Sequence, residues 1–169
     1  MKIPAELKPE MVWVCQDTRE QNPLCLDPLP VVVKGMPTGD YGLLDFPDLA
    51  ACERKELGDL CNCCGKERDR FEREVLRLLA YPVRCLVVEA SYEQIEAGDY
   101  RSEIKPQAVV SSLLGWQAQG LPVILAGDHT RAGRFVSKFL FIAARRRYRE
   151  CRALLGRFEP AEQSAQPKE

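Results

Sequence analysis

Residues 17–55 decide the fold and the chemistry, and they read DTREQNPLCLDPLPVVVKGMPTGDYGLLDFPDLAACERK. Acidic side chains and one lysine occur here in a fixed order, each beside a short apolar run: Asp17, Asp40, Glu53 and Lys55. Short apolar runs separated by Pro and Gly are typical of β-strands joined by turns. The stretch therefore predicts several strands, each flanked by a charged side chain.

Turn residues divide this region into four expected strands. They cover residues 12–16, 31–34, 41–44 and 49–55. Pro-rich and Gly-Asp turns separate them. We expect these strands to form an antiparallel meander.

Beyond residue 55 the pattern alternates between helices and buried strands. We expect helices over residues 65–80, 107–119 and 131–155, and strands over residues 84–89 and 122–126. This order predicts an α/β fold, with a mixed central sheet flanked by helices on both faces. Residues 1–11 are expected to form a leader, residues 12–155 one domain, and residues 156–169 a disordered tail.

The charged residues of the first stretch fit a metal site. Side chains alternate along a strand, so Glu53 and Lys55 point to the same face. Asp40 comes from the neighbouring hairpin strand and Asp17 from the end of the first strand, so we expect the three carboxylates to converge. Without a cation they would repel each other and raise one another's pKa. Oxygen ligands favour Mg²⁺ or Mn²⁺, and Lys55 can assist the hydrolysis of a phosphodiester.

Each short motif has an ordinary alternative. Glu-Arg-Lys alone is usually a solvated surface segment, Gly-Asp alone is usually a turn, and Asp-x-Arg-Glu alone is often a cap or a surface pair. Their occurrence together, in order and each beside an expected strand or hairpin, favours a functional site.

The combined motif resembles the signature of the XPF family of structure-specific DNA endonucleases. Here the signature reads Gly39-Asp40, then Glu53-Arg54-Lys55 followed by Asp59, and the similarity extends over about residues 12–150. The resemblance implies a restriction-endonuclease-like nuclease domain. It also implies the site residues: Asp17, Asp40 and Glu53 as metal ligands, Lys55 as the catalytic lysine, Glu20 and Asp59 as supporting groups, and Arg54 contacting DNA or holding the site.

The chain departs from the family pattern after its last helix. XPF-like proteins usually continue into paired helix-hairpin-helix motifs that grip duplex DNA, whereas only a short tail follows here. We therefore expect a separate DNA-binding partner. The leading hypothesis is a Mg²⁺- or Mn²⁺-dependent endonuclease acting on branched, flap or junction DNA in repair or recombination. The alternative is a non-catalytic DNA-binding or scaffold subunit of the same fold.

Basic residues offer a surface for that DNA, although the net charge of the chain is −1. The last expected helix carries a cationic stripe at positions 134, 138, 145 and 149, which suits a phosphate backbone but equally fits a solvated face. A second stripe at positions 66, 70, 73 and 77 is interleaved with acidic residues. The expected DNA contacts are Arg19, Arg54, Arg70, Arg73, Arg134 and Lys138.

The remaining features carry less information. Most of the eight cysteines lie singly in apolar runs, so we expect them buried and reduced. Cys61, Cys63 and Cys64 cluster, but no second ligand pair accompanies them and we expect no zinc site. His129 is either a general base or a neighbour of a helix cap. The apolar residues 135–144 form either a homodimer seam or a buried helix. With no signal-like or membrane-spanning run, we expect an intracellular protein, nucleoid-associated if it comes from a bacterium or phage.

Overall fold

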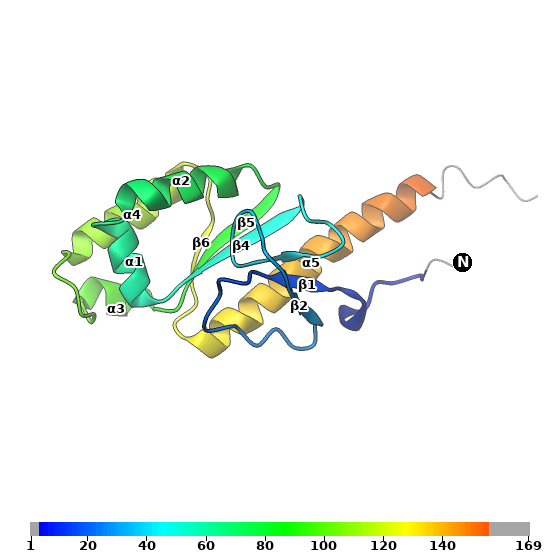
Figure 1. The fold of residues 1–169 in the computed structure, drawn as a ribbon, viewed down its shortest axis with the longest axis horizontal. Helices are drawn as coiled ribbons and strands as arrows, with labels where there is room; N and C mark the ends of the chain where they lie inside the picture. Colours follow the sequence, from blue (N-terminus) through cyan, green and yellow to red (C-terminus); the bar gives the residue numbers. More distant parts are fainter. Residues whose placement is uncertain (1–3, 156–169) are drawn as a thin grey trace, which may run out of the picture.

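The computed structural model describes residues 4–155 of the chain. The expected disordered tail at residues 156–169 therefore lies outside the described residues. Six strands form one sheet in the order β2-β1-β3-β4-β5-β6, with helices on both faces (Figure 1). The α/β architecture expected from the sequence is confirmed.

Every expected strand exists, although most are shorter than expected. They are β1 (Val14–Gln16), β2 (Val31–Val33), β3 (Tyr41–Leu43), β4 (Ala50–Lys55), β5 (Val83–Val88) and β6 (Val123–Leu125). Strand β3 pairs antiparallel with both β1 and β4, whereas β4, β5 and β6 run parallel. The sheet is therefore mixed.

The expected meander is wrong at its first connection. Strand β2 lies parallel to β1, with Val14 opposite Val31, and occupies the sheet edge. A hairpin needs a tight turn, whereas parallel neighbours need a long crossover. Residues 17–30 supply that crossover, and residues 19–22 within it line one pocket with Asp40, Arg54 and Lys55.

Five α-helices and one short 3₁₀-helix occur in the described part of the chain. They are η1 (Pro9–Met11), α1 (Leu57–Cys64), α2 (Arg68–Leu79), α3 (Tyr92–Ala97), α4 (Pro106–Ala118) and α5 (His129–Leu155). Helices α1 and α3 were not expected. The segment before β1, expected to be a leader without strong structure, contacts α5: Tyr148 donates a hydrogen bond to the Pro4 carbonyl.

The core has two halves because successive strand residues face opposite sides of the sheet. Cys52 and Val87 face α5, together with Val136 and Leu140 of that helix. On the other face, Leu86 and Val88 pack with α1, α2, α3 and α4, where Phe71 and Trp116 meet edge to face with ring centroids 4.8 Å apart. Helices therefore cover both faces of β4 and β5, and these two strands are the buried centre of the sheet.

Cysteine placement follows the expectation. All eight cysteines are free thiols, and six are buried, including Cys61, Cys63 and Cys64 of α1. Between residues 4 and 155, no three His, Cys, Asp or Glu side chains are grouped so that they could hold a metal ion. No helix in this same range is both long and apolar enough to cross a membrane.

Candidate active site

The β3–β4 hairpin places Asp40 against the Glu53-Arg54-Lys55 segment. The Asp40 amide donates to the Cys52 carbonyl at 2.8 Å. Gly39 precedes it with φ of +75°, and a Cβ there would lie 3.0 Å from the same carbonyl oxygen. Only glycine meets both conditions without strain. The Gly-Asp pair of the signature is therefore a backbone requirement of this hairpin as well as a source of a carboxylate.

Asp40, just before β3, is half-buried, and Glu53 of β4 is buried. The Arg54 amide donates to Asp40 Oδ2 at 2.8 Å. Burial raises the pKa of Asp40, against the opposing effects of that amide and of the Lys55 ammonium. Burial also raises the pKa of Glu53 to about 7. The nearby Asp40 charge raises this pKa further, and the Lys55 ammonium lowers it by less than burial raises it. Both groups would be ionised more readily beside a further cation.

The Lys55 ammonium contacts two oxygens of the same strand. It donates to Glu53 Oε1, and it lies 3.3 Å from the Arg54 carbonyl oxygen. Burial by itself would lower the pKa of Lys55, but the Glu53 carboxylate more than offsets it and the pKa is raised. A positive charge is therefore already stabilised at Glu53 and the Arg54 carbonyl.

The donor set at this point suits a hard divalent cation. The Asp40 and Glu53 carboxylates and the Arg54 carbonyl are all oxygen donors, which Mg²⁺ and Mn²⁺ prefer. The Lys55 ammonium already takes two of these oxygens as a cation would. These three groups fit a metal that binds through oxygen better than one that requires sulfur or nitrogen ligands.

Asp17 does not join this group, which corrects the expected convergence of three carboxylates. Its buried Oδ1 accepts from the Arg19 Nε at 2.6 Å and from the Arg19 amide at 2.8 Å, and Oδ2 accepts from the Met36 amide at 2.5 Å. Burial would raise the pKa of Asp17, but these donors together hold it below its usual value. The carboxylate thus fastens the crossover loop to the residues after β2.

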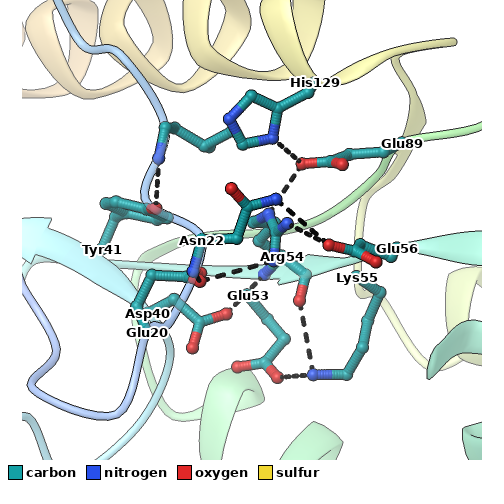
Figure 2. Close-up of polar contacts among 11 residues, drawn as sticks. Glu20, Asn22, Asp40, Tyr41, Glu53, Arg54, Lys55, Glu56, Glu89 and His129 are labelled. Carbon is teal, nitrogen blue, oxygen red and sulfur yellow. Dashed lines mark hydrogen bonds and ion pairs between the residues drawn. The ribbon is translucent and has the colours of Figure 1, made fainter.

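Arg54 is buried at the centre of a cluster of carboxylates (Figure 2). Its three donor nitrogens reach three different acidic residues. Nε donates to Glu89 at 2.7 Å, Nη2 to Glu56 at 2.9 Å and Nη1 to Glu20 at 3.4 Å. These contacts fit the second role expected of Arg54, holding the site. Glu20 likewise supports the site through Arg54.

Three further residues of this cluster, Asn22, Glu56 and Glu89, were not expected from the sequence, and His129, considered there as a possible general base, joins them. The His129 Nδ1 lies 2.7 Å from Glu89 Oε1, and Asn22 Nδ2 donates to Glu56 Oε1 at 3.2 Å. Glu89 directly follows β5, and its amide donates to the Lys55 carbonyl at 2.9 Å. Since neighbouring parallel strands end at one edge of a sheet, the acidic residue that ends the predicted strand 84–89 was the available signal.

A polar pocket of about 380 Å³ opens beside Asp40 and Lys55, and Glu53 lies outside its lining. Its lining includes Asp40, Lys55 and Asp59, with Glu20, Asn22 and Arg54 around them. A larger cavity of about 670 Å³ lies between α3 and α4 and contains none of the site residues. The chemistry of the lining, rather than size, identifies the first pocket as the candidate active site.

Of the expected DNA contacts, Arg19 and Arg54 line this pocket, and the other four do not. Arg19 lines it and is largely exposed, although its Nη2 donates to the Met36 carbonyl. Arg70 and Arg73 are exposed on α2, where Arg70 pairs with Glu67. Arg134 and Lys138 are exposed on α5.

Comparisons with known proteins agree with this picture. The model of the ERCC4 domain matches residues 16–139. Among solved structures, XPF from Aeropyrum pernix is similar with a TM-score of 0.65 and 18% sequence identity, over 93% of this chain and 69% of that chain. No curated protein sequence matches. The resemblance inferred from the signature and the expected fold are both confirmed.

Proposed function

Because this chain belongs to the ERCC4-domain family, we propose that it is a nuclease that hydrolyses DNA phosphodiesters with Mg²⁺ or Mn²⁺. The observation that carries the proposal is the pairing of Lys55 with Glu53 and the Arg54 carbonyl beside the half-buried Asp40 carboxylate. An oxygen donor set next to an ammonium group, in a polar pocket, suits the charge that develops on a phosphate during hydrolysis.

The roles of the residues follow from their contacts. Asp40, Glu53 and the Arg54 carbonyl would hold the cation. A bound Mg²⁺ or Mn²⁺ supplies Lewis acidity toward the phosphate and lowers the pKa of a bound water. Lys55 would then have its ammonium free of Glu53, and it could donate to a phosphate oxygen or orient the attacking water. Arg54 and Glu20 keep the backbone of β4 in place for these groups.

We propose that the substrate is branched, flap or junction DNA, as in the XPF family. A homodimer through residues 135–144 and a separate DNA-binding partner also remain predictions. In that segment Phe139 stacks on Phe135, with ring centroids 5.6 Å apart, and the Ile142 side chain is 46% exposed. The expected DNA contacts at Arg19, Arg70 and Arg73 belong to the same proposal.

A cleavage panel tests this function directly. Fork, flap, bubble and linear duplex DNA are incubated with the protein and Mn²⁺, with Mg²⁺ and with chelator. We expect metal-dependent cutting of at least one branched substrate and a loss of at least about a hundredfold in the Asp40→Asn and Lys55→Met variants. Asp48→Asn, which changes an exposed residue of the loop before β4, is the matched control.

The scaffold alternative predicts a different result. A protein that binds all of these substrates equally well in chelator, and cuts none of them with Mn²⁺, would be a DNA-binding subunit. Normal cutting by both Asp40→Asn and Lys55→Met would also overturn the assigned site.

A further inference from the structure

Helix α5 carries a row of cations along one side. At 100° of rotation per residue, the row falls within an arc of about 60°. We call it the α5 basic face, and it consists of Arg131, Arg134, Lys138, Arg145, Arg149 and Arg152. All six are exposed or partly exposed, because the opposite side of the helix, with Val136 and Leu140, packs into the core.

Few acidic groups neutralise this face. The single acidic residue of α5 is Glu150, which points well away from the arc and pairs with Arg146 and Arg147. Arg131 pairs with Asp128 just before the helix, at 3.3 Å. On α2, by contrast, Arg70 and Arg77 are each paired with a glutamate three residues before them. The two basic stripes noted in the sequence therefore differ in net charge.

Helix α5, which carries this face, begins beside the candidate active site. His129, the first residue of α5, contacts Glu89, which in turn contacts Arg54. From there α5 runs past the edge of the sheet, as Figure 1 shows. At about 1.5 Å per residue, the distance from Arg131 to Arg152 is roughly 30 Å. This length corresponds to about nine base pairs of duplex DNA, at roughly 3.4 Å per base pair.

We propose that the α5 basic face is the track along which a duplex arm of the substrate lies. The inference rests on the proposed function and adds where the DNA leaves the site. A phosphate backbone complements a row of cations that carries no carboxylate. A second copy centred on this face is a poorer occupant, because a two-fold contact there would bring like charges together. The homodimer proposed above would instead use Phe135, Phe139 and Ile142, which lie beside the arc.

Arm length is the property that tests the track. The protein is titrated, in chelator, with one junction carrying a duplex arm of about 4, 8, 12 or 16 base pairs. We expect affinity to rise with arm length until the arm covers the face, at roughly nine base pairs, and then to level off. Because no cleavage occurs in chelator, the readout does not depend on catalysis.

Two double variants locate the arm on the helix. Arg145→Gln with Arg149→Gln should weaken binding of the long arms about tenfold and leave the shortest arm unchanged. Arg134→Gln with Lys138→Gln should weaken binding at every arm length. Each pair should reduce the slope of log affinity against log salt by about two. Arg101→Gln with Lys105→Gln, which removes two exposed cations before α4, is the matched control and should match wild type.

Several results would overturn the track. Affinity that is independent of arm length would do so, as would α5 variants that behave like the control. A change in molecular mass, measured by light scattering, without a change in arm dependence would assign the face to an interface between copies. If affinity depends on arm length but no substrate is cut with Mn²⁺, the α5 track stands and the proposed nuclease activity is wrong. If a substrate is cut but affinity does not depend on arm length, the nuclease activity stands and the α5 track is wrong.

Discussion

Arg54 and Glu89 form a hydrogen-bonded ion pair, with 2.7 Å between Nε and Oε1. The pair joins β4, which carries the signature, to the residue that follows β5 in the sheet. Both side chains are buried, and the same Glu89 oxygen also contacts His129 at the start of α5. The central residue of Glu-Arg-Lys therefore links two strands and a helix.

Replacing Arg54 should destabilise the fold strongly. In Arg54→Gln three carboxylates lose their shared cation, which we expect to cost about 3–5 kcal/mol of unfolding free energy. Arg54→Lys should recover only part of this loss, since an ammonium cannot donate in the three fixed directions of a guanidinium. Urea denaturation at neutral pH measures both variants. A loss below about 1 kcal/mol in Arg54→Gln would show that the cluster is not a stabilising element.

His129 should act through its Nδ1. In His129→Asn the side-chain amide can still donate toward Glu89, whereas His129→Ala removes the donor. We expect the alanine variant to lose about 1 kcal/mol and the asparagine variant clearly less. Thermal and urea denaturation provide the comparison. Equal losses in the two variants would mean that the contact with Glu89 contributes little.

Asp17 should prove structural. An amide has a single acceptor oxygen, so Asp17→Asn cannot accept from both Arg19 and the Met36 amide. We expect a loss of about 1–3 kcal/mol of unfolding free energy.

The same variant separates a structural role from metal binding. Mn²⁺ affinity should change little in Asp17→Asn, while Asp40→Asn should lose at least about tenfold. Titration calorimetry measures both. A loss of Mn²⁺ affinity in Asp17→Asn as large as that in Asp40→Asn would restore Asp17 as a ligand.

Metal binding should release protons below neutral pH. Since the pKa of Glu53 is about 7 in the metal-free protein, this carboxyl is largely protonated at pH 6 and ionised at pH 8. A cation requires the ionised form, so Mn²⁺ affinity should rise with pH through this range. The raised pKa of Asp40 acts in the same direction, and the two groups titrate together.

Calorimetry in two buffers of different ionisation enthalpy counts the released protons. Glu53→Gln should release fewer protons at pH 6 than wild type. Affinity that is constant from pH 6 to pH 8 would contradict the coupling.

The sequence predicted the strands well and the short helices poorly. Continuous apolar runs such as residues 84–89 permit few other structures, whereas α1 is rich in cysteine and begins without a side-chain cap. Helix α3 did carry a signal, because Ser91 and Gln94 form a capping box. The parallel pairing of β1 and β2 depends on the path of residues 17–30, which no local pattern reveals.

The candidate site was predictable only in part, for the same reason. Asp40, Glu53 and Lys55 lie on one hairpin, so local strand geometry brings them together. Glu89 and His129 reach Arg54 only through the order of β4, β5 and α5 in space. Asp17 was expected to join the metal ligands because it follows a strand. Its carboxylate instead accepts hydrogen bonds from Arg19 and from the Met36 amide.

The contact of Lys55 with Glu53 and the Arg54 carbonyl has a consequence for the newly made protein. The ammonium acts as an internal counter-ion, so the chain can complete its core before any divalent ion arrives. If the proposed function holds, an entering Mg²⁺ or Mn²⁺ would exchange with an ammonium group inside an already folded chain, and no refolding would be needed to arm the site.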